Sequence, residues 1–204
     1  MNLSYIDRGE YMNFIVIEGD NGTGKDTLAQ ALAPYGFDIV TYKPEAGNAL
    51  KNARTAKTIE SFLEYNKVCS NLCLKNSNPF KTNLLIRYWT STLASAYADK
   101  NWTVAQVDRE LEKCLKEMAL PDYFIRLTCS MDERVRRIEE RGAAGNDDIT
   151  LERAAKYDFI FSHIMKKIPT RWIVISTSEM SPIQVKEKVL NLIYGNKNIY
   201  KEAS

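Results

Sequence analysis

Hydrophobic and polar positions along the chain show two kinds of pattern in turn: short apolar runs, and apolar residues at helical spacing. Short apolar or β-branched runs are typical of buried strands, and they occur at residues 14–18, 37–42, 83–87, 123–128 and 172–176. Helical spacing of apolar side chains predicts helices at residues 25–33, 46–75, 90–98, 104–118, 132–141, 151–166 and 182–194. Strands that alternate with helices over the whole length predict an α/β fold, with a parallel sheet covered by helices on both faces.

The chain has 204 residues, which is enough to bury a sizeable core in one domain. We find no internal repeat and no Gly/Ser linker, so residues 13–204 are predicted to form a single domain. Residues 1–12 show no periodicity, and two interpretations stay open: a disordered leader, or residues upstream of a natural start at Met12. Glycines and alanines in the stretch Gly142–Asp147 predict a mobile loop, within a lid around residues 141–156.

Composition and charge exclude several classes of protein. Lys and Arg number 28 against 26 Asp and Glu, a net charge of +2, which argues against nucleic acid or a membrane as partner. Apolar runs fall short of the roughly 20 residues of a membrane span, and a secretory signal is lacking, so the expected compartment is the cytoplasm. The four cysteines, which form no CxxC pair, are predicted to be free buried thiols: Cys69, Cys73, Cys114 and Cys129.

A glycine-rich loop connects the first predicted strand to the first predicted helix. Its candidate ATP- and phosphate-binding residues are Gly19, Asp20, Asn21, Gly22, Thr23, Gly24, Lys25, Asp26 and Thr27. The spacing Gly-x4-Gly-Lys in this context is typical of a loop whose backbone N–H groups surround phosphates at a helix N-terminus. Lys25 would place its ammonium between the β and γ phosphates, and Thr27 would offer a hydroxyl.

Asp26 departs from this pattern, because a Ser or Thr hydroxyl that binds Mg²⁺ usually follows the lysine. A carboxylate is a stronger Mg²⁺ ligand than a hydroxyl, yet it repels the triphosphate if no metal screens it. We therefore predict Asp26 as a ligand of Mg²⁺.

Six segments in order make the chain resemble thymidylate kinases, which are P-loop nucleoside monophosphate kinases. These segments are Phe14–Lys25, Tyr42–Glu45, Leu84–Ser91, Leu120–Leu127, Asp132–Gly142 and Arg171–Ile175. The resemblance runs from about Asn13 to Tyr194. It implies a three-layer P-loop NTPase fold with a five-stranded parallel sheet. It further implies transfer of the γ-phosphoryl group from ATP·Mg²⁺ to a nucleoside monophosphate, foremost dTMP, by a homodimer that acts on small-molecule nucleotides.

The same resemblance implies roles for individual residues. Arg87 and Lys67 would hold the acceptor phosphate, and the implied acceptor-binding set is Asn21, Pro44, Glu45, Lys67, Arg87, Ser91 and Tyr97. Some thymidylate kinases carry a basic residue inside the phosphate loop, whereas others bring an arginine from the lid. Gly22 fills that loop position here, which implies a basic residue from the lid. The candidates are Arg141, Arg153 and Lys156, and we expect Arg141 or Arg153 to be catalytic beside Lys25 and Arg87.

Departures from the thymidylate kinase pattern fall on functional positions. Asn21 replaces an acidic residue, Tyr42 an arginine and Ile86 an aspartate, while Asp147-Asp148 replaces the Asp-Arg pair of the lid. We hypothesise that Asp26 supplies the metal-directed carboxylate that is missing at Ile86. Two alternatives stay open: a kinase of the same fold for another deoxynucleotide or a nucleoside, and a noncatalytic P-loop module that binds a nucleotide.

Two further groups of side chains have competing interpretations. Arg134, Arg136 and Arg137 lie on one predicted helix with Glu139 and Glu140, and this spacing gives i,i+3 and i,i+4 pairs, so most of this run is predicted to be a solvated, salt-bridged helix face. Four aromatic residues are candidates for stacking on an acceptor base, although such spacing is more often that of a core: Phe62, Tyr88, Trp89 and Tyr97.

Overall fold

The computed structural model describes residues 14–75, 81–142 and 150–194. Five parallel strands form one sheet in the order β2-β3-β1-β4-β5. They are β1 (Phe14–Glu18), β2 (Phe37–Ile39), β3 (Thr82–Ile86), β4 (Tyr123–Thr128) and β5 (Arg171–Ser176). The central strand β1 is apolar on both faces and fully buried, as expected where helices cover both sides of a sheet. The predicted parallel sheet is confirmed.

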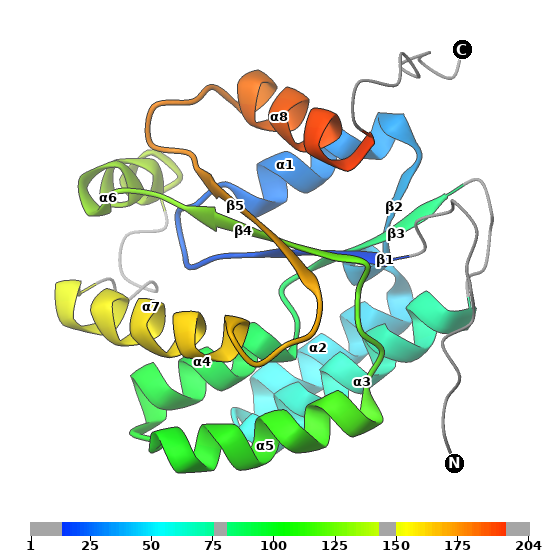
Figure 1. Cartoon of the computed structure of the whole chain (residues 1–204), viewed down its shortest axis with the longest axis vertical. Coiled ribbons are helices and arrows are strands. Elements are labelled where there is room, and N and C mark those ends of the chain that lie inside the picture. The colour runs from blue at the N-terminus through cyan, green and yellow to red at the C-terminus, as the bar shows by residue number, and fades with distance from the viewer. Residues whose placement is uncertain (1–13, 76–80, 143–149, 195–204) are drawn as a thin grey trace.

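Helices cover both faces of the sheet, in three layers (Figure 1). Their bounds are α1 (Lys25–Leu32), α2 (Pro44–Ala56), α3 (Ile59–Lys75), α4 (Trp89–Lys100), α5 (Val104–Glu117), α6 (Met131–Glu140), α7 (Leu151–Met165) and α8 (Pro182–Tyr194). Helices α1 and α8 lie on one face, and α3, α4, α5 and α7 lie on the other. Helix α6 lies beyond the carboxyl end of β4, at the edge where ligands bind in such sheets. None of the described helices is long and apolar enough to cross a membrane.

Two predicted elements were wrong in extent. The strand expected at residues 37–42 stops at Ile39, because residues Val40–Tyr42 turn into a 3₁₀ helix that leads directly to Pro44 and α2. The single helix expected at residues 46–75 is two helices, since Lys57 has the left-handed φ of 57° that ends α2. Thr58 then accepts a hydrogen bond from the backbone N–H of Ser61 at 3.1 Å, at the start of α3.

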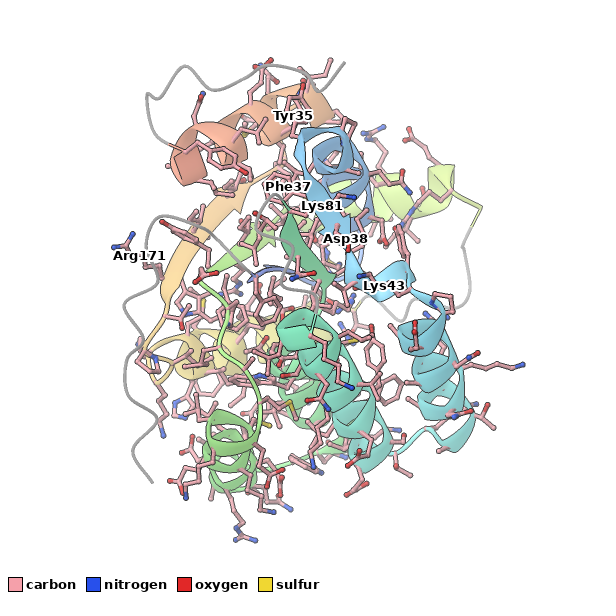
Figure 2. All side chains as sticks on the ribbon, turned by 90° about the vertical axis from the view of Figure 1, so that its right-hand side faces the viewer. Tyr35, Phe37, Asp38, Lys43, Lys81 and Arg171 are labelled. Atoms are coloured by element: carbon pink, nitrogen blue, oxygen red, sulfur yellow. The ribbon has the colours of Figure 1, made fainter. Side chains whose placement is uncertain are left out.

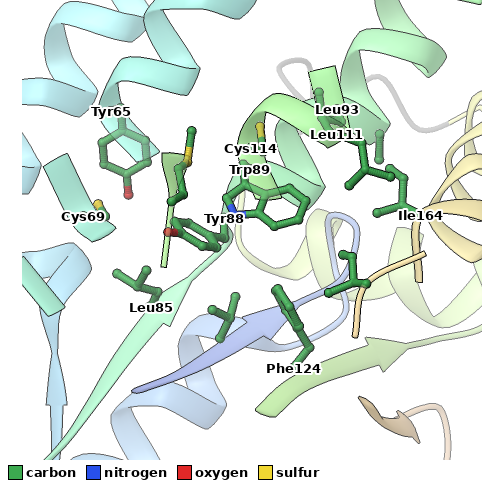
Figure 3. Packing of buried hydrophobic residues seen from close by; sticks show 14 of the residues in the cluster. Tyr65, Cys69, Leu85, Tyr88, Trp89, Leu93, Leu111, Cys114, Phe124 and Ile164 are labelled. Atoms are coloured by element: carbon green, nitrogen blue, oxygen red, sulfur yellow. The ribbon is translucent and has the colours of Figure 1, made fainter. Parts of the chain in front are cut away.

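The core consists of one apolar cluster on each side of the sheet. The larger cluster packs β1, β3 and β4 against helices α2 to α5 and α7, and it contains Tyr88 and Trp89 (Figure 3). Both aromatic rings are essentially fully buried, so their interpretation as core residues is confirmed. Cys69, Cys73 and Cys114 lie in the same cluster as free thiols, and burial raises the pKa of each. The smaller cluster includes Ile86 and packs the other face against α1 and α8.

Candidate active site

The glycine-rich loop lies where the sequence places it, between the end of β1 and the start of α1. Gly19, Gly22 and Gly24 have φ values of 141°, 80° and 90°, a region that side chains with a Cβ rarely adopt. A Cβ on Gly22 would lie 3.0 Å from both the Cβ and the carbonyl oxygen of Arg134, so α6 packs directly on the loop. The loop can therefore keep its path only with glycine at these positions.

Lys25 begins α1 and points back into the loop. Its side chain is buried, and Nζ donates to the carbonyl oxygen of Asp20 at 2.7 Å. Burial and the nearby charge of Arg87 hold the pKa of Lys25 well below its ordinary value. A second cation next to this ammonium is unfavourable in the free protein, whereas an anion in the loop would relieve both effects.

A cavity of about 170 Å³ lies in front of this loop. Its lining combines loop backbone with three cationic side chains: Asn21, Gly22, Gly24, Lys25, Asp26, Thr27, Arg87 and Arg141. Small size and positive charge suit a phosphate group rather than a base or a sugar. The structure thus brings together Lys25, Arg87 and Arg141, while Arg153 and Lys156, the other basic residues proposed from the lid, do not line this cavity.

Arg87 reaches the cavity because the backbone turns sharply after β3. Its N–H donates to the carbonyl of Ile17 at 2.9 Å, and its φ of 64° is left-handed. This backbone conformation costs a residue with a Cβ about 1 kcal/mol or more, and it is concentrated at functional sites. The guanidinium Nη2 donates a short hydrogen bond to the side-chain oxygen of Asn21 in the phosphate loop.

Glu18, the last residue of β1, binds the backbone and side chains at the start of α4. Its carboxylate accepts hydrogen bonds from the Tyr88 backbone N–H at 3.0 Å and from the hydroxyls of Thr90 and Ser91. The Ser91 hydroxyl also lies 3.0 Å from the hydroxyl of Tyr157 on α7. Glu18 is fully buried, and burial raises its pKa although these donors oppose the shift. Glu18 thereby fixes the segment that carries Arg87, and Ser91, which we expected at the acceptor, serves this anchor.

The arginines of α6 were partly misassigned from the sequence. Arg134 is buried: its Nη2 pairs with Asp20 at 2.6 Å, and its Nε donates to the carbonyl of Asn21 at 2.7 Å. Arg137 donates to the Thr177 carbonyl at 2.7 Å and to the Gly22 carbonyl at 3.4 Å. The expected solvated face is therefore wrong for Arg134, whereas Arg137 is half-buried and keeps an expected i,i+4 pair with Glu133 at 2.7 Å. It is right for Arg136, which pairs with Glu133 and Glu140 on the outside.

The spacing of these arginines contained a signal that the charge pairing obscured. Positions 134, 137 and 141 are separated by three and four residues, so they lie on one face of a helix. Arg141 completes this stripe at the cavity, where its Nε donates to the Arg137 carbonyl at 3.2 Å. Helix α6 thus presents an arginine stripe, consisting of Arg134, Arg137 and Arg141, to the phosphate loop.

Arg153 approaches the loop from α7. Its Nη1 lies 3.0 Å from both carboxylate oxygens of Asp20, and its Nε lies 2.7 Å from Asp99 on α4. Lys156, the third basic candidate, pairs with Glu152 on the same helix at 2.7 Å. Asp147 and Asp148, which belong to the same predicted lid, lie outside the described residues, as does Met12.

The other predicted acceptor residues are not among those that line this cavity. Pro44 and Glu45 form the exposed first turn of α2. Lys67 on α3 pairs with Glu64 at 3.3 Å and with Glu117 at 3.0 Å.

The ring of Tyr97 packs against Phe159 at 5.9 Å. Lys43 pairs with Asp38 at 2.7 Å, and the two lie side by side at the end of β2 (Figure 2).

Asp26 lies at the exposed start of α1, and its Oδ1 accepts a hydrogen bond from the Tyr42 hydroxyl at 3.3 Å. Among the described residues, no group of three or more acidic, His or Cys side chains is placed to hold a metal. A single carboxylate beside the Thr27 hydroxyl nevertheless fits Mg²⁺, which commonly takes one or two carboxylates and completes its shell with water and substrate phosphates.

A larger, open hollow of about 690 Å³ lies at the carboxyl ends of β4 and β5. Its lining includes Ser130, Asp132, Ser178 and Glu179. Glu133 also lines this hollow, and its carboxylate pairs with Arg137 at 2.7 Å. Because Arg137 also contacts the Gly22 carbonyl, this ion pair connects the wall of the hollow to the phosphate loop.

Comparisons with known proteins agree with this architecture. No protein-family profile matches the chain. A probable thymidylate kinase of Pyrococcus horikoshii is 26% identical over 209 residues, which cover 88% of this chain and 98% of that protein. The structure of a thymidylate kinase from Candida albicans superimposes with a TM-score of 0.67 at 19% identity, covering 92% of this chain and 93% of the other. A deoxyadenosine kinase from M. mycoides with bound dATP gives a TM-score of 0.60 at 18% identity, covering 89% and 99%.

The sheet order, the glycine-rich loop and these superpositions place the chain in the class of proteins with a P-loop kinase fold. Within that class the chain is similar to a thymidylate kinase over nearly its whole length, which confirms the resemblance read from its six segments.

Proposed function

We propose that this kinase transfers the γ-phosphoryl group of ATP to a nucleoside monophosphate, with dTMP as the acceptor. The observation that carries the proposal is the convergence of Lys25, Arg87 and Arg141 on one cavity with the loop backbone. Phosphoryl transfer depends on positioning and on neutralising the charge of the phosphates, and these three cations supply both.

The charge of the cavity favours a monophosphate over a nucleoside as acceptor. A nucleoside hydroxyl needs a general base to remove its proton, whereas a monophosphate is already ionised and needs cations. Asp26 is the carboxylate in the cavity lining, and in this proposal it serves the metal and the donor rather than the acceptor. Arg87 can grip the acceptor phosphate with two parallel hydrogen bonds, once phosphate replaces Asn21 as its partner.

The donor would lie along the loop towards α6. Its phosphates would occupy the loop beside Lys25, and its nucleoside would extend into the hollow lined by Ser130 and Ser178. Asp26 and Thr27 would hold Mg²⁺, which neutralises phosphate charge when bound. In an Asp26→Ser variant, calorimetry should detect a weaker dependence of ATP binding on Mg²⁺. An unchanged Mg²⁺ titration would remove Asp26 from the metal site.

The choice of dTMP is supported by the 26% identity to a probable thymidylate kinase. A second acceptor, another deoxynucleoside monophosphate, is favoured by Tyr42. This residue stands where the resemblance implies an arginine, and its hydroxyl is bound to Asp26. The two acceptors therefore belong in the same assay.

The test is ADP release from ATP·Mg²⁺ with a panel of nucleosides and nucleoside monophosphates, next to a Lys25→Ala control. Turnover with dTMP alone supports the proposal in full, and turnover with another monophosphate retains the reaction but changes the acceptor. Turnover with a nucleoside contradicts the argument from charge. ATP binding without turnover would make the protein a noncatalytic nucleotide-binding module.

A further inference from the structure

Asp20 is a buried carboxylate inside the phosphate loop. It is 5% exposed, and a buried carboxylate is stable only when it is paired. Its oxygens meet Arg134 Nη2 at 2.6 Å, Arg153 Nη1 at 3.0 Å and the backbone N–H of Asn21 at 2.9 Å. Burial alone would raise the pKa of Asp20, but the charges of Arg153 and Arg134 outweigh it and lower that pKa. The carboxylate is thus ionised and bound from two helices.

The two arginines that meet Asp20 are held differently. Arg134 is 4% exposed and is also fixed by the Asn21 carbonyl, so it is a permanent part of the loop's support. The side chain of Arg153 is 17% exposed, and it bridges Asp20 to Asp99 on α4. Its guanidinium also lies over the ring of Tyr157 at 5.7 Å. Within the part of the chain that the structure describes, the guanidinium of Arg153 is held by charge-assisted contacts and this ring.

Besides Arg134, three more cations meet at Asp20 and its neighbour Asn21. Its carbonyl oxygen accepts from Lys25 Nζ at 2.7 Å while its carboxylate binds Arg153. The next residue, Asn21, accepts from Arg87. Like charges gathered on two consecutive loop residues repel one another, and the buried carboxylate of Asp20 offsets this repulsion together with the exposed carboxylate of Asp26.

We propose that Asp20 is a positioning residue that holds Arg153 at the phosphate loop, beside Lys25 and Arg87, for use in phosphoryl transfer. This role rests on the proposed kinase function. Asp20 also places a negative charge next to bound phosphates, so it weakens ATP binding while it orients the arginine. Removing the charge of Asp20 should therefore lower kcat but strengthen ATP binding. A general loss of structure would instead weaken both.

The first variant is Asp20→Asn, which keeps the size and removes the charge. We expect kcat to fall about 10- to 100-fold, the usual cost of losing a partner that orients a functional side chain. The KM for ATP should stay unchanged or decrease, because the repulsion is gone. A variant in which kcat is unchanged, or in which the KM for ATP rises in step with the fall in kcat, overturns the proposal.

The matched control is Asp99→Asn, which removes the other carboxylate on Arg153 from a position outside the loop. A smaller fall in kcat and no tighter ATP binding are expected, because Asp20 still holds the guanidinium. The decisive comparison is Asp20→Asn in an Arg153→Ala background. If Asp20 acts through Arg153, the second change lowers kcat no further; a full additional fall contradicts the role.

Folding is controlled separately, because Asp20→Asn leaves Arg134 with one partner fewer in a buried place. The double variant Asp20→Leu with Arg134→Leu removes both charges, a replacement that is often neutral for stability. It should melt near the wild-type temperature and show the same fall in kcat; wild-type kcat in this variant would refute the role of Asp20. A wild-type protein without transfer would refute the proposed function itself, whereas transfer that Asp20→Asn leaves intact would refute only the role of Asp20.

Discussion

The end of β1 and the start of the phosphate loop each bury a carboxylate, two residues apart, in opposite ways. Glu18 is surrounded by hydroxyls and one backbone N–H, and burial raises its pKa. Asp20 is surrounded by guanidinium groups, which lower its pKa against the effect of burial. In Glu18 the hydrogen bonds come from neutral groups that anchor a backbone segment, whereas in Asp20 the partners are cations and the carboxylate balances their charge.

The largest expected effect tests the cationic side of this comparison. Replacing Arg134 with Leu breaks a buried ion pair and removes a donor to the Asn21 carbonyl, so we expect a loss of about 3 kcal/mol in the free energy of unfolding. Urea denaturation measures it. Arg136→Leu on the exposed face of the same helix is the control and should be close to wild type. Equal losses in both variants would mean that burial of the pair is unimportant.

The neutral side is tested by Glu18→Ala. This change leaves the buried hydroxyl of Thr90 and the N–H of Tyr88 without an acceptor, at an expected cost of about 2 kcal/mol. It should also reduce turnover, because the segment that carries Arg87 loses its anchor. Ser91→Ala removes one of the same donors and should cost about 1 kcal/mol. A Glu18→Ala protein with wild-type stability and turnover would show that the hydrogen bonds of Glu18 to Tyr88, Thr90 and Ser91 have no anchoring role.

The pH dependence of stability should separate the two carboxylates. The lowered pKa of Asp20 gives a contribution that is present above its ordinary value of 3.8 and is lost as pH falls through the lowered pKa. The raised pKa of Glu18 gives one that is present below its ordinary value of 4.5 and is lost as pH rises through the raised pKa.

Urea titrations across acidic and neutral pH should therefore diverge for the two variants. Asp20→Asn should flatten the curve below about pH 4, and Glu18→Gln should flatten it above about pH 5. Identical profiles for both variants would contradict the assignment of opposite shifts.

The smallest effect is expected for a third carboxylate, Asp26, which lies exposed in the same loop region. Tyr42→Phe removes its hydrogen bond of 3.3 Å, and stability should change by less than about 0.5 kcal/mol. A loss comparable to that of Glu18→Ala would place Asp26 among the buried, structural carboxylates. Thermal unfolding of the wild type and of Tyr42→Phe, with and without Mg²⁺, measures this change in stability.

The fold followed from the sequence because hydrophobic periodicity is local. Strands β1 and β4 and helix α8 have the predicted bounds, since each apolar run ends where polar residues begin. The helix break at Lys57 escaped prediction because a lysine carries no signal for a left-handed φ. The end of β2 escaped because Val40 and Tyr42 suit a strand as well as a 3₁₀ turn.

The sequence predicted residues of the candidate site only where they belong to a recognisable motif. Lys25, Arg87 and Arg141 line one cavity, as the motifs suggested. Arg134 was missed because it was grouped with Arg136 and Arg137, whose pairing within α6 can be read from the sequence. The packing of α6 on the loop depends on contacts more than 100 positions apart. Glu18 was missed because it reads as the polar end of an apolar strand.

The close approach of α6 to Gly22 limits how this chain can evolve. A Cβ at residue 22 would lie 3.0 Å from Arg134 at a φ of 80° that residues with a Cβ rarely adopt, so an arginine there would need a small shift of α6 and a strained backbone. An arrangement with the basic residue inside the loop and the present one are therefore separated by more than a single substitution. A chain with this packing would keep recruiting its cations from neighbouring helices, and its descendants should vary in which helix supplies them before they vary at Gly22.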